Sequence, residues 1–307
     1  MSVLPTVSAI IPTYNRAGLL GRAIRSVLAQ TFQDWELLVV DDASEDHTKQ
    51  VVLDFQDPRI RYLLRDTNGG GGAARNTGIR AARGQYLAYL DSDNEMLPKR
   101  LEEQLQVFKN SRLTELGVVT CGILLVDLEP PKVNLPLVRG KVFDDLLKLR
   151  AGVWDTNCIM VKHTPGSPEI LWDETLTAGM DRDYLLRFTR RYQLDFTGQV
   201  LVHKYLAHGY ERIGSEPRNV LRGRLEHLEK YRVDLQAHPR TLRFLHLHVA
   251  RIYLNLKDMH GVRRHTVLAV LAHPRGLRTY VWLLGALLGP WSYRLAVKLF
   301  PSLKFSP

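Results

Sequence analysis

Short apolar runs alternate with helical patterns from Ser8 to Leu90, and this alternation limits the folds open to the chain. The runs cover residues 8–12, 35–40, 60–64 and 86–90, and each has the length of one buried strand. Between them, apolar residues recur at the spacing that places them on one face of a helix. Strands that alternate with helices over short connections predict an α/β fold, with a doubly wound, mostly parallel sheet flanked by helices.

Polar loops follow three of these predicted strands. They read Thr13-Tyr14-Asn15-Arg16, Asp41-Asp42-Ala43-Ser44 and Asp91-Ser92-Asp93-Asn94. The carboxyl ends of parallel strands share one edge of a sheet, and ligands of open α/β sheets bind there. Two carboxylates in an Asp-x-Asp sequence repel each other unless a cation neutralises them. Their oxygen atoms suit Mg²⁺ or Mn²⁺, which often bridges carboxylates to substrate phosphates.

These loops together could bind a nucleoside diphosphate. The ring of Tyr14 could stack on a base, Asp42 could accept a hydrogen bond from the base or the ribose, and a metal ion at Asp93 could bind the diphosphate. Each residue also has a simpler interpretation. Tyr14 could be a packing aromatic, Asp42 a carboxylate at a helix N-terminus, and Asp91-Ser92-Asp93 an ordinary turn.

Four consecutive glycines at 69–72 precede a predicted helix over 73–82. We expect them to form a flexible loop, with Arg75 and Asn76 close to the phosphates. The first predicted strand is not followed by Gly-x-Gly-x-x-Gly, and the chain has no Walker A sequence. Nicotinamide and ATP cofactors are therefore not expected.

The charge of the chain is unevenly distributed. The 307 residues carry a net charge of +10, but residues 1–200 sum to −2 and residues 201–307 to +12. Nine of the 11 histidines also lie after residue 200. A near-neutral first part and a basic last part predict that the two parts have different functions. The basic part favours an anionic binding partner.

We therefore expect a catalytic domain over 1–212 and a basic, amphipathic helical region over 213–307. The domain would consist of a nucleotide-binding half, 1–112, and an acceptor half, 113–212. Its second half has three further predicted strands and a helix that begins near Gly179; the strands cover residues 117–126, 157–161 and 193–202.

The strand-end segments resemble the inverting glycosyltransferases of family 2, which have the GT-A fold. The matching segments are residues 8–16, 39–44, 73–79 and 90–94, together with Trp172-Asp173-Glu174 and Asp181. The resemblance covers roughly residues 5–210, about two thirds of the chain.

The resemblance implies a role for each matching residue. Asp181 corresponds to the general base. The metal, Mn²⁺ or Mg²⁺, would be bound by Asp93 and Asp91, with His208 as a further ligand near the diphosphate. The residues implied in binding the nucleotide sugar are Pro12, Tyr14, Asn15, Arg16, Asp42, Arg75, Asn76, Asp91 and Ser92.

The implied reaction is a metal-dependent transfer of a sugar from a nucleotide-diphosphate sugar to a hydroxyl group, with inversion. UDP-sugars are the expected donors, and GDP- and dTDP-sugars remain open. The acceptor would be a saccharide or a lipid-linked molecule, in the synthesis of a cell-surface polysaccharide or glycolipid. The chain has no recognised nucleic-acid-binding motif, so no nucleic-acid partner is expected.

Met180 departs from the family pattern, which has an acidic residue before the base. An apolar neighbour would desolvate Asp181 and raise its pKa. The alternative is therefore a catalytically impaired sugar-nucleotide-binding protein on the same fold. We interpret Asp183 as a carboxylate of the first helical turn, favoured by the helix dipole.

The C-terminal region contains an apolar run at 280–290, far shorter than the ~20 residues of a transmembrane helix. With its aromatic and basic residues, the segment 276–300 suits an amphipathic helix on an anionic membrane surface. The alternative is a helix packed on the catalytic domain or on a second subunit of a homodimer.

The chain is expected in the cytoplasm, either free or as a peripheral protein on the inner face of the cell membrane. Its N-terminus does not have the pattern of a signal peptide. Its two cysteines, Cys121 and Cys158, have no metal-ligand spacing and indicate a reducing compartment.

Overall fold

The computed structural model describes residues 4–148, 155–166, 170–176, 178–207 and 216–299. The chain divides into two compact units. The first, which we call the sheet unit, consists of residues 1–146, 151–174 and 180–209. The second, the helical unit, consists of residues 147–150, 175–179 and 210–307. Each unit is described by itself.

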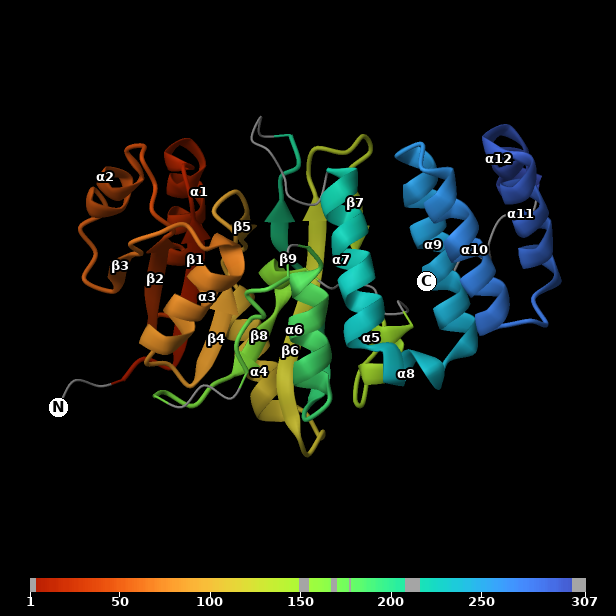
Figure 1. The fold of residues 1–307 in the computed structure, drawn as a ribbon. Helices are drawn as coiled ribbons and strands as arrows, with labels where there is room; N and C mark the ends of the chain where they lie inside the picture. Colours follow the sequence, from red (N-terminus) through yellow and green to blue (C-terminus); the bar gives the residue numbers. More distant parts are fainter. Residues whose placement is uncertain (1–3, 149–154, 167–169, 177, 208–215, 300–307) are drawn as a thin grey trace. The chain divides into compact units, whose positions relative to one another are not determined.

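The first half of the sheet is parallel, as the sequence predicts. Its strands are β1 (Val7–Thr13), β2 (Trp35–Asp41), β3 (Ile60–Leu64) and β4 (Tyr86–Tyr89), in the order β3-β2-β1-β4 (Figure 1). All residues of β2 are buried, because helices cover both faces of the sheet. The connecting helices are α1 (Ala17–Leu28), α2 (Thr48–Leu53) and α3 (Gly70–Ala81).

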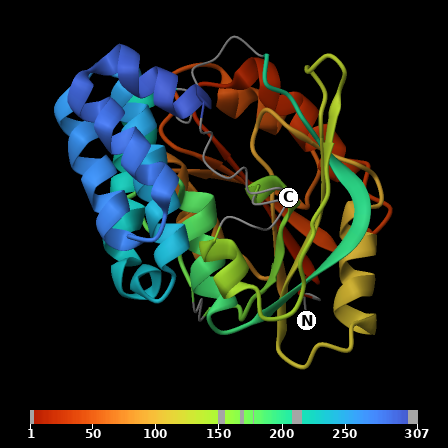
Figure 2. The ribbon, with the colours of Figure 1, turned by 90° about the vertical axis from the view of Figure 1, so that its right-hand side faces the viewer.

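The second half of the sheet is mixed. The order continues β4-β8-β6-β9-β5, and β7 (Lys132–Asn134) pairs with β6. These strands are β8 (Met160–Lys162), β6 (Leu116–Leu125), β9 (Gln193–Lys204) and β5 (Glu95–Met96). β8 runs antiparallel to both β4 and β6, whereas β6 and β9 are parallel. Figure 2 shows the strong curl of β9. The α/β prediction is confirmed, but parallel pairing prevails only in the first half.

The predicted strand over 157–161 is in fact a turn of 3₁₀ helix, Thr156–Cys158, followed by the short β8. Asp155 caps this turn, since its carboxylate accepts a hydrogen bond from the backbone N–H of Asn157 at 3.1 Å. A local side-chain acceptor of this kind competes with strand pairing.

Helices cover both faces of the sheet. α1, α2 and α4 (Arg100–Asn110) pack on the face to which Ala9, Ile11 and Leu37 point. α3 packs on the opposite face, and α6 (Met180–Thr189) packs against β6. Gly78 lets α3 approach the sheet closely, because a Cβ atom there would lie 2.7 Å from Cγ2 of Ile10.

The helical unit contains α7 (Pro217–Lys230), α8 (Arg232–Gln236), α9 (Pro239–Asn255), α10 (Met259–Ala272), α11 (Leu277–Leu288) and α12 (Pro290–Leu299). A further short helix, α5 (Phe143–Leu147), ends at the boundary between the units. Helices α9 to α12 pack in sequence order (Figure 1), around a core that includes Leu247, Ala250, Trp282 and Tyr293. Within the described ranges, no helix has the length and apolar character needed to cross a membrane.

Candidate active site

The structure brings the three polar loops together at the carboxyl edge of the parallel strands. Thr13 and Asp41 are register partners at the ends of β1 and β2. The backbone N–H of Asn15 donates to Oγ of Ser44 at 2.9 Å, which joins the first two loops. Arg16 joins the first loop to the third through an ion pair with Asp93 at 2.5 Å. The edge is therefore one continuous polar site.

The loop after β1 presents Tyr14 to solvent and uses Asn15 as a structural residue. The side chain of Tyr14 is 43% exposed, so its ring is accessible to a ligand. Asn15 has a φ of 49°, and its Oδ1 atom accepts a hydrogen bond from the backbone of Glu45 at 2.8 Å. Asn tolerates the left-handed region better than most residues, which explains its place in this turn. Pro12 is half-buried within β1, beside Val40.

Asp42 is buried and accepts hydrogen bonds from the start of α3. The backbone N–H groups of Gly69 and Gly70 donate to its carboxylate at 3.1 and 2.7 Å. Arg65 forms an ion pair with the same carboxylate. The first N–H groups of a helix have no partner within the helix, and an anion placed there satisfies them.

The expectation of a glycine loop is therefore corrected for three of the four glycines. Gly70, Gly71 and Gly72 form the first turn of α3, which begins three residues earlier than the sequence predicts. Gly70 has a φ of 82°, a conformation that favours glycine. The backbone is helical here because its first N–H groups donate to the carboxylate of Asp42. Local sequence patterns do not reveal this contact.

Asp91 is held from two sides. Arg75 donates from Nη2 to its Oδ1 atom at 2.5 Å, and Asn157 donates from Nδ2 to its Oδ2 atom at 2.9 Å. Burial by itself would raise the pKa of Asp91, but the positive charges of Arg75 and Lys204 outweigh it and lower that pKa. Asp91 is therefore ionised at neutral pH and ready to interact with cations.

Asp93 lies beside two arginines. Arg16 pairs with its carboxylate, and Arg22 donates from Nη2 to its backbone carbonyl at 2.5 Å. Ser92, between the two aspartates, is buried.

The donor set of Asp91 and Asp93 fits a hard divalent cation, which a substrate diphosphate and water would complete. Arg16 and Arg75 form ion pairs with the same two carboxylates whose negative charge such a cation would neutralise. Within the described ranges, no group of three or more His, Cys, Asp or Glu side chains could hold a metal ion. His208, the further predicted ligand, lies outside the described residues.

Asp181 stands in the first turn of α6, half-buried within the same charge network. Burial raises the pKa of Asp181, and the negative charges of Asp155 and Asp91 raise it further, while Arg75 opposes them. Lys204, at the end of β9, forms an ion pair with Asp155 and is attracted to both Asp91 and Asp181. Three carboxylates and two cations thus share one partly buried region.

Asn76, predicted near the phosphates, is fully occupied elsewhere. Its Nδ2 atom donates to the carbonyl of Trp172 at 2.9 Å and to Oε1 of Glu174 at 2.6 Å, and its Oδ1 atom accepts from the backbone N–H of Trp172 at 2.7 Å. Both amide hydrogens are therefore used, and the side chain fixes the segment that leads to α6. Trp172 in turn lies 4.8 Å from the guanidinium of Arg75, centroid to Cζ.

Met180 has a packing role that explains its apolar side chain. A Cβ atom at Gly72 would lie only 3.3 Å from its sulfur atom, so the start of α6 fits closely against the start of α3. Asp183 is buried and accepts from Nε of Arg187 at 2.8 Å, one helical turn away. This contact agrees with the structural interpretation of Asp183.

The structure adds residues to the site that the sequence did not single out. They are Arg22, Arg65, Asp155, Asn157 and Lys204. Lys204 had one signal, its position at the end of the last predicted strand. Asn157 belongs to the 3₁₀ turn where the sequence predicts a strand, and Asp155 caps that turn just before the predicted strand, so the orientation of neither side chain could be inferred.

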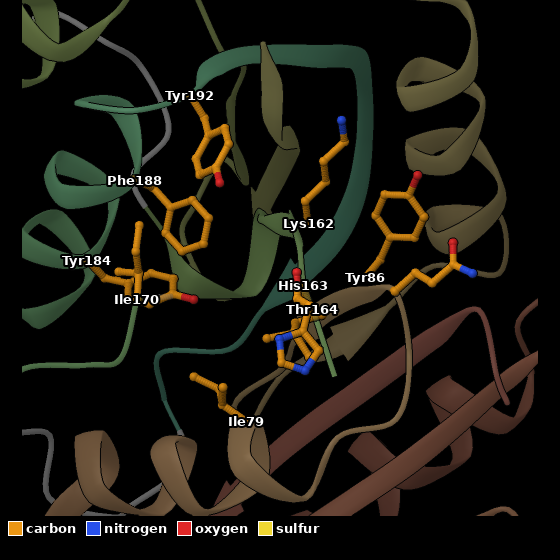
Figure 3. A pocket seen from close by; sticks show the side chains of 11 residues that line it. Ile79, Tyr86, Lys162, His163, Thr164, Ile170, Tyr184, Phe188 and Tyr192 are labelled. Carbon is orange, nitrogen blue, oxygen red and sulfur yellow. The ribbon is translucent and has the colours of Figure 1, made fainter. Parts of the chain in front are cut away.

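A separate pocket lies at the opposite end of β4 from Asp91. It has a volume of about 280 Å³ and is lined by residues from β4, β8, α3 and α6. Figure 3 shows Phe188 and Tyr192 on one side of it and Tyr86 on the other, with His163 near Ile79. Its lining includes none of the predicted site residues, so it is distinct from the polar edge.

Comparison with known proteins identifies relatives of the chain. A family model described as glycosyl transferase family 2 matches residues 8–132. The putative colanic acid biosynthesis glycosyl transferase WcaA of Escherichia coli is 31% identical over 224 residues, which cover 70% of this chain and 77% of WcaA. The UDP-Glc:alpha-D-GlcNAc-diphosphoundecaprenol beta-1,3-glucosyltransferase WfgD of Escherichia coli is 41% identical over 108 residues, which cover 35% of this chain and 43% of WfgD. The uncharacterized glycosyltransferase RP339 of Rickettsia prowazekii is 32% identical over 64% of this chain and 63% of its own length. The matches thus span less than two thirds of WfgD and of RP339.

Solved structures share the fold at low sequence identity. Staphylococcus aureus TarS in complex with UDP-GlcNAc superposes with a TM-score of 0.61 at 15% identity, over 95% of this chain and 90% of that chain. The mannosyltransferase PcManGT of Pyrobaculum calidifontis, in complex with GDP-Man and Mn²⁺, gives a TM-score of 0.54 at 19% identity, over 100% of this chain and 89% of that chain.

Proposed function

Because this chain belongs to glycosyltransferase family 2 and has the GT-A fold, we propose that it transfers a sugar from a nucleotide-diphosphate sugar to an acceptor hydroxyl group with inversion. One observation carries the proposal. Asp181, Asp91 and Arg75 interact near the carboxyl edge of the sheet, and the exposed ring of Tyr14 belongs to the loop that follows β1 at the same edge. A base, a phosphate-binding cation and a surface for a nucleoside are thereby combined in one site.

The proposed donor is a UDP-sugar. WfgD is named for UDP-Glc, TarS was solved with UDP-GlcNAc, and PcManGT was solved with GDP-Man. Uridine is favoured because WfgD shares 41% identity with this chain over the matched part. We propose that the ring of Tyr14 stacks on the base and that Asp42 accepts hydrogen bonds from the nucleoside.

The diphosphate would lie between the first and third polar loops. Arg75 and Arg16 would face its negative charge, and both are already held by the carboxylates of the third loop. A Mn²⁺ or Mg²⁺ ion bound by Asp91 and Asp93 would supply further positive charge to the leaving diphosphate. Since Arg75 is fixed before the substrate arrives, it needs little reorganisation during the reaction.

Asp181 would act as the general base. It would take the proton of the acceptor hydroxyl group while that oxygen forms a bond to the anomeric carbon. The bond from this carbon to the diphosphate oxygen breaks at the same time, on the opposite side, so the configuration inverts. One base is sufficient, in contrast to hydrolases that use two catalytic carboxylates.

The acceptor would be a saccharide or a lipid-linked molecule of cell-surface polysaccharide or glycolipid synthesis. WcaA and WfgD, named for colanic acid biosynthesis and for a diphosphoundecaprenol acceptor, support this class. A lipid-linked acceptor would place the enzyme at the cytoplasmic face of a membrane.

Thermal unfolding with a panel of nucleotides tests the donor site. We expect UDP with Mn²⁺ to raise the midpoint more than GDP, dTDP, ADP or CMP does. A ligand at 100 times its dissociation constant should add about 2.7 kcal/mol to the free energy of unfolding. The metal-dependent part of the shift should be lost in Asp93→Asn and kept in Asp54→Asn, which changes an exposed carboxylate at the C-terminal end of α2. If no nucleoside diphosphate raised the midpoint with either metal, the proposal would be overturned.

A further inference from the structure

The outer face of α11 is apolar and exposed. Tyr280, Leu284, Leu287 and Leu288 follow one another at the spacing that places them on a single face of the helix. Leu284 is 60% exposed and Leu288 is 78% exposed. A row of large apolar side chains in contact with water is unusual for a helix that only packs within its own protein, and such a row often marks an interaction site.

The outer face of α12 combines an apolar row with a basic row. Trp291, Leu295 and Leu299 are exposed and spaced four residues apart, and Trp291 is 75% exposed. Arg294 and Lys298 are exposed at the same spacing, one position before Leu295 and Leu299. Apolar and basic side chains therefore lie side by side along this helix.

The two helices form a packed hairpin, so the exposed rows are not the result of a missing core. Trp282 and Ala286 of α11 and Tyr293 of α12 are buried in the core of the helical unit. A Cβ atom at Gly285 would lie 2.9 Å from the carbonyl oxygen of Ser292, which shows how closely the helices approach each other. The hairpin thus presents one face inward and the other to the surroundings.

The charge of the segment identifies its partner. The chain contains no Asp or Glu after Asp258, whereas seven Lys and Arg residues follow it. Arg275, Arg278, Arg294 and Lys298 belong to the hairpin or directly precede it, and all four are exposed. Basic side chains next to apolar and aromatic ones are typical of helices that lie in the interface of anionic membranes.

We propose that the outer face of the α11–α12 hairpin docks on a membrane surface rich in anionic lipid. The turn between the helices, Gly289 and Pro290, would insert first. It is flanked by Leu287, Leu288 and Trp291, which are among the exposed apolar side chains. These side chains enter the headgroup region, while the basic residues contact lipid phosphates. The inference rests on the proposed function only in that a lipid-linked acceptor gives a reason for membrane binding.

A second copy of the chain fits this face less well. Pairing the face with itself would bring Arg278, Arg294 and Lys298 close to their counterparts, and the segment has no carboxylate to neutralise them. Like charges brought together in this way oppose association.

Vesicle co-sedimentation of the full chain tests the proposal. We expect binding to vesicles of phosphatidylcholine with phosphatidylglycerol, and much weaker binding to phosphatidylcholine alone. Raising the ionic strength from 0.1 M to 1 M should weaken the binding, because the Debye length shrinks from about 10 Å to about 3 Å. Neither donor nor acceptor is added, so the result does not depend on the transfer reaction.

Matched variants assign the binding to the hairpin. The variant Leu287→Gln/Leu288→Gln/Trp291→Gln should bind anionic vesicles at least roughly tenfold more weakly, since three membrane-inserted side chains are lost. The control Leu53→Gln/Val233→Gln changes apolar side chains that are 51% and 75% exposed elsewhere and should bind as the wild type does. Similarly, Arg294→Gln/Lys298→Gln should weaken binding, and Lys49→Gln/Lys109→Gln should not.

Three results would overturn the proposal. The wild type could fail to bind anionic vesicles, or the hairpin and control variants could bind equally well. A wild-type dimer in light scattering that the hairpin triple variant converts to a monomer would instead assign the face to a second copy.

Circular dichroism should show unchanged helix content and melting for the triple variant, because the altered side chains are exposed. Loss of nucleotide-induced stabilisation together with intact vesicle binding would count against the proposed transferase function alone.

Discussion

At the scale of single residues, the structure contains a conflict at Asp181. A general base must be ionised, yet burial and the charges of Asp155 and Asp91 raise the pKa of Asp181 above the usual value of about 3.9. Arg75 opposes this shift and so keeps the carboxylate available. The surroundings that disfavour the ionised form of Asp181 lower the stability of the fold at neutral pH, and the raised pKa makes the carboxylate a stronger base.

The variant Asp181→Asn separates activity from stability. We expect turnover to fall at least roughly a hundredfold, as is typical when a general base is lost. We also expect the free energy of unfolding at pH 7 to rise by about 0.5–2 kcal/mol, as functional residues often cost stability. The pKa of this carboxyl group is higher in the folded state than in the unfolded state. As pH rises from the unfolded-state pKa through the folded-state pKa, the free energy of unfolding therefore falls, and above that window the loss stays constant, including at neutral pH.

Chemical denaturation at pH 7 and a donor-turnover assay would measure both effects. The gain in stability should vanish below the pKa of the unfolded state, where the carboxyl group is protonated in both states. The nucleotide-induced thermal shift should persist in this variant, because Asp181 faces the acceptor in the proposed reaction. Full turnover in Asp181→Asn would exclude Asp181 as the base.

At the scale of elements, two helical glycines have opposite roles. Gly78 allows α3 to lie against β1 and β2, since a Cβ atom there would meet Ile10 and Val40 at 2.7 and 3.2 Å. Gly21 in α1 has only the flexible end of Arg25 nearby, at 3.3 Å. Sequence alone treats the two glycines alike, because both lie inside helices.

We therefore expect Gly78→Ala and Gly21→Ala to change stability in opposite directions. The first should cost about 1–3 kcal/mol, because the added methyl group overpacks the core. The second should gain up to about 1 kcal/mol from the better helix propensity of Ala. Urea denaturation of both variants provides the comparison, and a neutral or stabilising Gly78→Ala would contradict the close approach of α3.

At the scale of the whole molecule, the many histidines of the C-terminal region introduce a pH dependence. His246 of α9 and His265 of α10 lie with their Nδ1 atoms 3.1 Å apart. Burial lowers the pKa of each to about 4, and for His246 the charge of His265 adds to this effect. Both rings are therefore neutral in the folded protein over a range where the unfolded chain would bind protons.

The protein should accordingly lose stability as pH falls from about 6.5, the usual pKa of His, toward 4. The unfolded state binds more protons than the folded state within this window, so the free energy of unfolding decreases with falling pH. The variant His246→Leu/His265→Phe should show a smaller decrease between pH 7.5 and 5 in thermal unfolding. The exposed His260→Gln serves as the control and should retain the decrease of the wild type.

The sequence by itself determined the α/β class, the parallel half of the sheet and the loops that carry Tyr14, Asp42, Asp91 and Asp93. It could do so because strand length, helical spacing and turn residues are local properties of the chain. The helical character of residues 216–299 followed for the same reason.

Only the tertiary structure decided what surrounds these loops. The helical start at Gly70 depends on Asp42, 28 residues earlier, and the orientation of Asp91 depends on Asn157, 66 residues later. The orientation of Asn76 likewise depends on Trp172, to whose carbonyl oxygen its side chain donates a hydrogen bond. Such contacts join segments distant in sequence through buried polar groups that must find a partner, and no local pattern specifies which partner that is.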